Sequence, residues 1–157
     1  MSDAIVGQIE LLAKAKNWDE ALTRIIEHFA AESGTIHVMG DDALLHLAAA
    51  SRGIPEVVLN TIKTVPVGKG MAGLAVERKQ PIDACNIQTD TSGDVRPGAL
   101  ATGLQGSIVV PILRGDEAVG ALGIANRSER TFSDAETTLL LRIGRSMGSV
   151  PGRAASM

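Results

Sequence analysis

The feature that most constrains this chain is a pair of apolar segments within residues 106–126, separated by a Gly-Asp pair at 115–116. A two-residue loop of this composition is typical of a tight hairpin between antiparallel strands. Successive side chains of a strand point to opposite faces, yet Ile108 and Val110 on one face and Val109 on the other are all apolar. The hairpin therefore predicts a sheet that is covered on both faces.

The second strand of this hairpin, residues 117–126, is rich in glycine and alanine. Small side chains leave space above a sheet, so we expect a ligand cavity over one face of the hairpin. Solid packing of that face, or its burial against a second subunit, is the alternative.

The length and composition indicate the size of the domain, and the charge indicates which kinds of partner to expect. A chain of 157 residues with 45% hydrophobic content is the size of one domain with one core. The net charge is −3 and the basic residues are scattered, which argues against nucleic acid or an acidic membrane surface as a partner. Residues 1–4 lack a basic leader, and no run approaches the roughly 18 apolar residues of a membrane span. We therefore expect a cytoplasmic protein.

Apolar periodicity and capping signals predict the order of the remaining elements. Two helices are expected within residues 3–33, the second opened by a capping box at Asn17 and Glu20 and ended by Gly34. A second capping box at Ser133 and Glu136 opens a last helix. Its buried face is expected to carry Ala135, Leu139, Ile143 and Met147. Between these helices we expect strands at 35–39, 43–49, 64–67 and 81–87, helices at 55–62 and 71–79, and an irregular segment at 88–105.

This order predicts an α+β domain built around an antiparallel sheet. The two terminal helices would pack on one face of the sheet. The middle helices and the long segment 88–105 would cover the other face, and a connection of that length is more often functional than idle.

Several motifs in this order resemble the GAF domain family, a small-molecule sensing module. They are residues 64–73, 80–82, 106–112, 119–123 and 132–136. The resemblance spans about 17–147, within a single domain at 1–148, and leaves a tail at 149–157 that we expect to be disordered. It implies a profilin-like or PAS-like sheet of five or six strands and a ligand cavity on the face away from the terminal helices. It also implies a homodimer through those helices and a separate signalling partner protein.

The irregular segment carries the leading candidate for ligand contact, Arg96. A guanidinium group can clamp a carboxylate or phosphate through paired hydrogen bonds, which favours a small anion or anionic metabolite as the ligand. An ion pair that holds the loop, for example with Asp94, is the alternative role. The hydroxyls of Thr102 and Ser107 and the backbone amide of Gly106 could add hydrogen bonds, or could serve only their own turns.

The single cysteine, Cys85, excludes an internal disulfide and a multi-cysteine metal site within one chain. We expect a small buried apolar residue in a strand, and include it among the candidate ligand contacts. GAF-type reductases of free methionine sulfoxide use several cysteines, because one thiol cannot resolve its own oxidised form. Asn86 and the absence of tyrosine argue against a bilin chromophore. We therefore expect no catalytic residue and no cofactor.

Two further patterns need a structural test. His37 and His46 are equally distant from the pair Asp41-Asp42, so they would face each other across a hairpin as half of a metal site. No third ligand has a suitable spacing, so we expect no metal. The glycines of residues 68–73 match a dinucleotide-binding spacing, but the strand before them is short and contains Pro66. We interpret these glycines as turn and packing residues.

The sequence thus leads to three hypotheses. The first is a sensor that is not an enzyme and that binds a small molecule and acts through a partner. The second is an enzyme that reduces free methionine sulfoxide. The third is a dimerisation module without a ligand.

Overall fold

The computed structural model describes residues 2–89 and 103–148, and the structural statements below concern these residues. The chain begins with two helices and a strand pair, continues through alternating short helices and strands, and ends with a long hairpin and a helix. In order, the elements are α1 (Ser2–Lys14), α2 (Trp18–His28), β1 (Ser33–Met39), β2 (Leu44–Ala50), α3 (Glu56–Ile62), β3 (Thr64–Pro66), α4 (Gly70–Arg78), β4 (Ile82–Ala84), β5 (Ser107–Arg114), β6 (Glu117–Ala125) and α5 (Asp134–Gly148).

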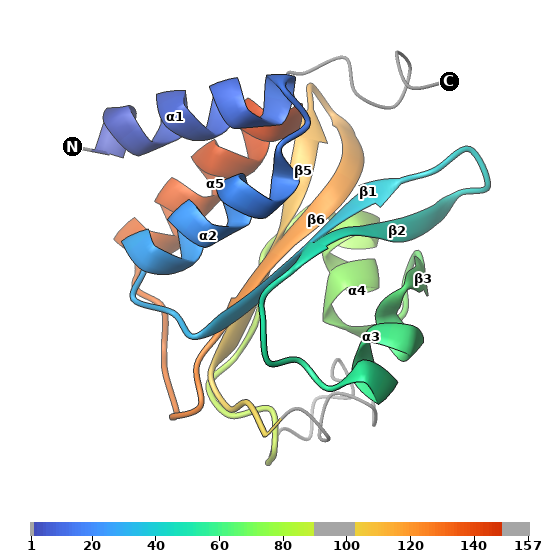
Figure 1. Cartoon of the computed structure of the whole chain (residues 1–157), viewed down its shortest axis with the longest axis vertical. Coiled ribbons are helices and arrows are strands. Elements are labelled where there is room, and N and C mark those ends of the chain that lie inside the picture. The colour runs from blue at the N-terminus through green and yellow to red at the C-terminus, as the bar shows by residue number, and fades with distance from the viewer. Residues whose placement is uncertain (1, 90–102, 149–157) are drawn as a thin grey trace.

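All strands belong to one six-stranded sheet with the order β3-β2-β1-β6-β5-β4, and every neighbouring pair is antiparallel. Helices α1, α2 and α5 form a layer on one face, and α3 and α4 lie on the other (Figure 1). The predicted α+β class and the predicted division of helices between the two faces are both confirmed. None of the helices in the described part of the chain is long and apolar enough to span a bilayer.

The hairpin of β5 and β6 closes as the sequence predicts. Arg114 pairs with Glu117, and Gly115 in the turn between them has a positive φ of 62°. Ile108 and Val110 pack against the helical layer, whereas Val109 packs toward α4 on the opposite face. The two-sided apolar pattern therefore reflects burial of both faces.

The two faces of the sheet are filled unequally. The larger core lies between the sheet and helices α1, α2 and α5, where Ile9, Ile25 and Ile143 are fully buried. Each such side chain stabilises the fold by about 1.5–3 kcal/mol through removal of apolar surface from water. The smaller core lies under α4 and includes Leu45 and Val76. The thinner packing on this second face leaves room beside α4.

The predicted capping box at Ser133 is complete, whereas the one at Asn17 forms in one direction only, because the Asn17 amide donates to the Leu12 carbonyl at 2.9 Å. The Asn17 side chain accepts a hydrogen bond from the Glu20 backbone amide at 3.4 Å. The Ser133 hydroxyl accepts from the Glu136 amide at 3.1 Å, and the Glu136 carboxylate accepts from the Ser133 amide at 2.9 Å. Together these side chains satisfy backbone donors that have no partner inside their helices.

The predicted end of the second helix at Gly34 is wrong. Helix α2 ends at His28, and Ala30 then adopts a positive φ of 52°. Gly34 instead lies in β1, where an added Cβ would be 2.7 Å from the Gly123 carbonyl oxygen and 3.0 Å from a methyl group of Leu22. The glycine is needed for close packing rather than for helix termination.

The predicted buried face of the last helix is partly wrong. Ala135 is exposed and Leu139 is only half-buried, whereas Leu140, Ile143 and Met147 are buried. The apolar stripe is therefore rotated from the expected one. The predicted tail at 149–157 lies outside the described residues.

Candidate ligand-binding site

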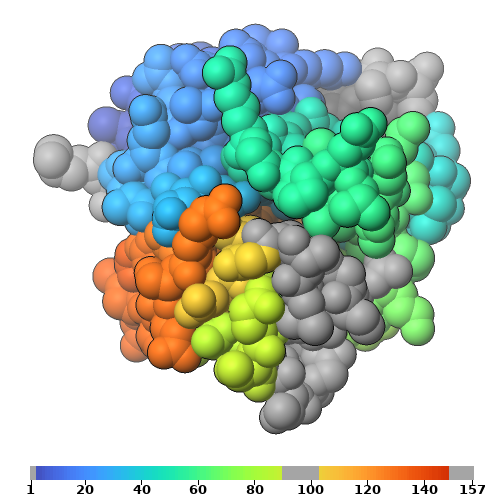
Figure 2. Space-filling model, turned by 60° about the horizontal axis from the view of Figure 1, so that its bottom comes forward, coloured from blue at the N-terminus to red at the C-terminus, as the bar shows by residue number. Residues whose placement is uncertain are grey.

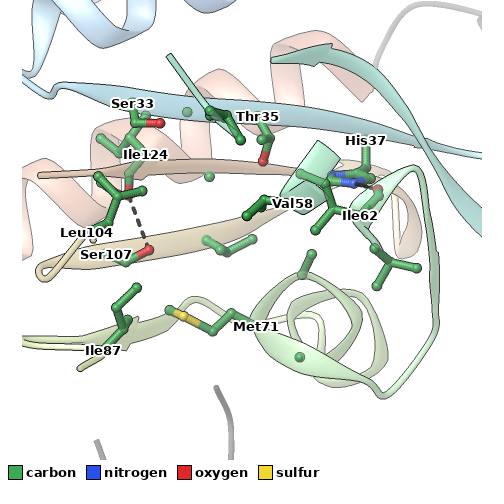
Figure 3. A pocket seen from close by; sticks show the side chains of 18 of the residues that line it. Ser33, Thr35, His37, Val58, Ile62, Met71, Ile87, Leu104, Ser107 and Ile124 are labelled. Atoms are coloured by element: carbon green, nitrogen blue, oxygen red, sulfur yellow. Dashed lines mark hydrogen bonds between the residues drawn. The ribbon is translucent and has the colours of Figure 1, made fainter. Parts of the chain in front are cut away.

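A cavity of about 180 Å³ opens between the sheet and the start of α4, on the face opposite the helical layer. Its lining comes from β1, β5 and β6 below, and from α3, α4 and the segments on either side of residues 90–102 above (Figure 3). The lining residues are Ser33, Gly34, Thr35, His37, Ile54, Val58, Thr61, Ile62, Val65, Lys69, Gly70, Met71, Ala72, Ile87, Leu104, Ser107, Val109, Gly123, Ile124 and Ala125.

The floor of the cavity depends on a missing side chain. Gly123 of β6 pairs with Thr35 of β1 on one side and with Val109 of β5 on the other. A Cβ on Gly123 would lie 3.2 Å from a Val109 methyl and 3.6 Å from the Thr35 hydroxyl oxygen. The small residues of β6 therefore do leave space above the sheet, as the sequence predicts.

The walls come from parts of the chain that lie far apart in sequence. Val58 and Ile62 of α3, with Met71 of α4, line one end, and Ile87 and Leu104 line the other (Figure 3). The Ile87 amide donates to the Gln105 carbonyl at 2.7 Å, which joins the segments on either side of residues 90–102. Figure 2 shows these segments side by side on the surface, in yellow-green and yellow, below the green segment that contains α3.

A buried histidine is among the residues that line this cavity. His37 projects from the central strand β1, its residue is only 3% exposed, and its Nε2 lies 2.9 Å from the Ile62 carbonyl oxygen. A carbonyl only accepts, so Nε2 carries the proton and Nδ1 of the neutral ring has a free lone pair. Among the described residues, Nδ1 is the only buried side-chain nitrogen or oxygen without a hydrogen-bond partner. Burial lowers the pKa of His37 below 6.5, against the opposing effect of the Ile62 hydrogen bond.

The other polar lining groups differ in how far they are already paired. Ser33 shares a hydrogen bond with Ser51 at 2.9 Å, and the Ser107 hydroxyl donates to the Ile124 carbonyl at 3.4 Å. The Thr35 hydroxyl points toward the cavity (Figure 3). Lys69, the residue before α4, is exposed, so its charge belongs to the rim rather than to the interior.

The family model of the GAF domain matches residues 17–150, most of the chain. This chain belongs to the GAF domain family. A search of curated proteins finds no match. Among solved structures, the GAF domain of an Acinetobacter phosphoenolpyruvate-protein phosphotransferase is 16% identical, with a TM-score of 0.77 over 99% of this chain and 93% of that one. The GAF domain of the corresponding Coxiella burnetii protein is 21% identical, with a TM-score of 0.76 over 99% and 95%.

An enzyme is also among the structural neighbours of this GAF domain. The free methionine-R-sulfoxide reductase of Neisseria meningitidis, solved with its substrate, is 15% identical, with a TM-score of 0.75 over 95% of this chain and 87% of that one. At such low identity these likenesses establish the shared fold and leave the ligand and the chemistry of this GAF domain to be argued from its own residues.

Only some of the residues predicted to contact a ligand line the cavity of this GAF domain. Arg96, Asp94 and Thr102 lie outside the described residues. Ser107 lines the cavity. Gly106 does not line it, and its amide donates to the Ser128 carbonyl at 3.0 Å, so it is not available to a ligand.

The expectation that Cys85 is buried is wrong. The predicted strand at 81–87 pairs only over Ile82–Ala84, so Cys85 follows the strand and its side chain is exposed. Cys85 is also not among the residues that line the cavity. Its backbone carbonyl accepts from the Arg130 amide at 3.1 Å, which fixes the backbone here.

The expected pairing of His37 with His46 is also wrong. The Gly40 amide donates to the Leu44 carbonyl at 2.8 Å, so the loop between β1 and β2 has three residues, 41–43, and not the two expected. Val38 therefore pairs with His46 and His37 with Leu47, and the two imidazoles are not opposite each other. His46 instead contacts the Asp42 carboxylate at 2.9 Å, and this hydrogen bond lowers the pKa of Asp42. Among the described residues, no cluster of three or more ligating side chains could hold a metal ion.

The glycine-rich segment serves turns and packing, as interpreted from the sequence. Gly68 and Gly70 have positive φ angles of 87° and 65°. A Cβ on Gly73 would lie 2.4 Å from the Pro66 carbonyl oxygen. The strands in residues 2–89 and 103–148 pair only antiparallel, whereas a dinucleotide-binding fold requires a parallel crossover.

Sequence reasoning missed the importance of β1 and α3 for the cavity. Thr35 and His37 are two residues apart, so they share a face of a strand that is otherwise mostly apolar. This spacing indicates that the two polar side chains face the same space. Nothing in the sequence indicates that Ile62 would accept the His37 hydrogen bond.

Proposed function

We propose that this GAF domain is a small-molecule sensor that is not an enzyme, binds its ligand in the cavity above β1, β5 and β6, and passes occupancy to a partner protein. One observation carries the proposal: a cavity of about 180 Å³ with mainly apolar walls lies over the face of the sheet opposite the terminal helices, and its floor includes the polar residues Thr35, His37 and Ser107. The cytoplasmic location expected from the sequence belongs to this proposal.

Coupling to a partner requires two arrangements that bind the ligand differently. Helix α3 is the element best suited to move, because only Val58 among its residues is buried and the helix packs lightly on the other elements. Its last residue, Ile62, both lines the cavity and accepts the His37 hydrogen bond. Ligand binding would therefore change the position of α3 relative to the sheet.

The proposal includes a homodimer through the terminal helices. Leu11 on α1 is 69% exposed, the largest exposure of any large hydrophobic residue in the described part of the chain. Gly7 lies one helical turn earlier, and in the described part of the chain no atom outside its own helix backbone comes within 4 Å of its Cβ position. A second copy packed on α1 would bury this apolar surface, which is otherwise in contact with water.

The reductase alternative is supported by the fold likeness and by the exposure of Cys85. Two observations weigh against it. A reacting thiol must contact its substrate, and Cys85 does not line the cavity. A chain with one cysteine also has no second thiol to resolve the oxidised sulfur by disulfide exchange.

The decisive experiment is identification of bound small molecules by native mass spectrometry of the purified protein, followed by thermal-shift measurements with those molecules. Gly123→Val would fill the floor of the cavity and should abolish the mass adduct and the thermal shift. Gly7→Ala, on a helix far from the cavity, should preserve both. Absence of any adduct and of any shift across a broad metabolite set would favour a dimerisation module without a ligand.

The enzyme alternative is tested separately. Thiol-dependent turnover of free methionine sulfoxide should be absent from the wild-type protein. Turnover that disappears in Cys85→Ser would contradict the non-enzymatic proposal.

A further inference from the structure

We propose that the hydroxyl of Thr35 forms a hydrogen bond with the single polar group of the ligand, and that the ligand is otherwise apolar, uncharged and about the size of one ring. This inference rests on the proposed function, because it assumes that the cavity binds a ligand. It adds the chemical class of the ligand and names the residue that selects it.

Thr35 lies beside the gap that Gly123 leaves in the floor of the cavity. The two residues pair across β1 and β6, so their side-chain positions are on the same face of the sheet. A Cβ on Gly123 would lie 3.6 Å from the Thr35 hydroxyl oxygen. Thr35 is half-buried, and its hydroxyl points toward the cavity (Figure 3). A ligand that fills the gap above Gly123 would therefore contact this hydroxyl.

The Thr35 hydroxyl differs from the other hydroxyls of the cavity because it has no partner in the described part of the chain. Four described residues that line the cavity carry a hydroxyl, and three of these hydroxyls form hydrogen bonds within the protein, those of Ser33, Thr61 and Ser107. No described residue forms a hydrogen bond with the Thr35 hydroxyl. Its oxygen is also accessible, since the only enclosed and unpaired side-chain nitrogen or oxygen among the described residues is Nδ1 of His37. The Thr35 hydroxyl is therefore free to bind a ligand.

His37, two residues further along β1, does not compete with Thr35 for the ligand. Its Nε2 is paired with the Ile62 carbonyl oxygen at 2.9 Å, and its Nδ1 is enclosed by the protein. Burial lowers the pKa of His37 below 6.5, so the ring is neutral at pH 7. The ring therefore supplies part of a wall rather than a polar contact.

The size of the cavity and its walls limit the rest of the ligand. An engineered apolar cavity of roughly 150 Å³ accommodates benzene, so about 180 Å³ suits a ligand of one ring or similar size. Val58, Ile62 and Val109 supply aliphatic walls, and the flexible thioether of Met71 can adapt to the ligand's shape. Most of the ligand surface must therefore be apolar.

The polar group of the ligand is expected to be uncharged. A carboxylate or phosphate would lose its hydration in the cavity, and one neutral hydroxyl does not replace that hydration. Among the described residues of the lining, Lys69 is the only one with a permanent charge, and it is exposed at the rim. A ligand hydroxyl, carbonyl or amide needs fewer partners, and the Thr35 hydroxyl can donate to it or accept from it. This class differs from the small anion expected from the sequence, so the test includes an anion.

The test uses three probes that share one ring: phenol, toluene and benzoate. Phenol and toluene have the same number of non-hydrogen atoms, but only phenol has a hydroxyl. Water also hydrates phenol better than toluene, so the informative quantity is the change in the ratio of their affinities between two proteins. Titration of amide resonances in NMR spectra measures these affinities. We expect benzoate to bind more weakly than phenol to the wild-type protein.

Thr35→Val replaces the hydroxyl with a methyl group of similar volume and keeps a β-branched residue in the strand. We expect the phenol-to-toluene affinity ratio to fall about tenfold in this variant, because phenol loses its hydrogen-bond partner and toluene does not. Thr35→Ser supplies a hydroxyl at the same position and should recover most of the wild-type ratio. Thr64→Val is the matched control, since it makes the same change at an exposed residue of β3 outside the cavity lining. It should leave the ratio unchanged.

The stability of the ligand-free protein separates a binding role from a structural one. Thr35→Val removes a half-buried hydroxyl that has no partner among the described residues, so the variant should melt at or above the wild-type temperature. A lower melting temperature would indicate that this hydroxyl stabilises the fold and would overturn the inference.

Further outcomes would overturn the inference while leaving a ligand-binding function intact. These are an unchanged ratio in Thr35→Val, an equal fall of the ratio in Thr64→Val, or tighter binding of benzoate than of phenol. If none of the probes binds but native mass spectrometry finds another ligand, the stated chemical class is wrong and the sensor proposal survives. If neither approach detects a ligand, both proposals fail.

Discussion

Nε2 of His37 lies 2.9 Å from the carbonyl oxygen of Ile62, and this hydrogen bond joins the central strand β1 to the last residue of α3. The next residue after α3, Lys63, accepts a second hydrogen bond from the Leu47 amide at 2.9 Å. Helix α3 is thus attached to the sheet mainly at its C-terminal end. Its first residues, Glu56 and Val57, are exposed.

The first prediction concerns the pH dependence of stability. The pKa of His37 in the folded protein lies below the value of about 6.5 for the unfolded chain, so between the two values the unfolded state binds more protons. The free energy of unfolding should therefore fall as the pH decreases through 6.5 toward the folded pKa. Urea denaturation at several pH values from 7.5 to 5 measures this slope.

His37→Gln should flatten that slope, because it removes the titrating group. His28→Gln leaves His37 in place and should keep the wild-type slope. An equal slope in the wild-type protein and His37→Gln would contradict the assignment.

The second prediction concerns the capping box of α5. The Ser133 amide and then the Arg130 guanidinium lower the pKa of the Glu136 carboxyl, and the Arg130–Glu136 ion pair measures 2.7 Å. A lowered carboxyl pKa stabilises the fold above the unfolded pKa of about 4.5, and this contribution is lost as the pH falls through the folded pKa. Glu136→Gln should cost about 1 kcal/mol at pH 7 and should weaken the pH dependence of stability between pH 5 and 3.

Ser133→Ala is the matched control for this capping box. It removes the hydroxyl that accepts from the Glu136 amide and should also cost about 1 kcal/mol. Its backbone amide still donates to Glu136, so the acid dependence should remain. Denaturant titrations at pH 7, 5 and 3 distinguish the two variants.

The third prediction compares two helical glycines. A Cβ on Gly144 of α5 would lie 2.6 Å from the Pro111 carbonyl oxygen, so Gly144→Ala should force the helix away from β5 and cost about 1–3 kcal/mol. Gly7 of α1 has open space around it, so Gly7→Ala should stabilise by up to about 1 kcal/mol through helix propensity. Thermal unfolding of both variants tests the pair, and a stabilised Gly144→Ala would show that the α5–β5 contact is looser than described.

The fourth prediction tests the proposed dimer. Leu11→Glu places a charge on the exposed apolar position of α1 and should convert a dimer to a monomer, measured by light scattering during gel filtration. Val57→Glu alters an equally exposed residue, 67% accessible, on α3 in the opposite layer. It should leave the dimer intact. A dimer that resists Leu11→Glu but dissociates in Val57→Glu would place the interface on the other face.

The sequence predicted the framework of the fold because the relevant signals are local. The Gly115-Asp116 turn, the N-cap residues Asn17 and Ser133, and the apolar residues on both faces of β5 each depend on neighbouring residues. Such patterns are satisfied by short-range hydrogen bonds and by the alternation of side chains along a strand. Local motifs of this kind also indicated the resemblance to the GAF domain family, and the family match over residues 17–150 confirms it.

Other features of the fold depend on contacts that local sequence patterns do not predict. Glycine is common at the ends of helices, and Gly34 was predicted to end one. In the structure it lies in β1, where Gly123 and Leu22 come too close to leave room for a side chain. The sequence also did not show that the β1–β2 loop has three residues, 41–43, rather than two, and this loop length sets the register that separates His37 from His46.

The sequence by itself determined that this protein has a two-faced antiparallel sheet with helices at both ends of the chain, because burial periodicity and capping act over a few residues. Only the tertiary structure decided that Thr35, His37, Ile62 and Gly123 meet around one cavity. These residues are brought together from β1, β6 and α3 by sheet order and helix packing. The free energy of those contacts depends on distances between residues far apart in the chain, which no local pattern records.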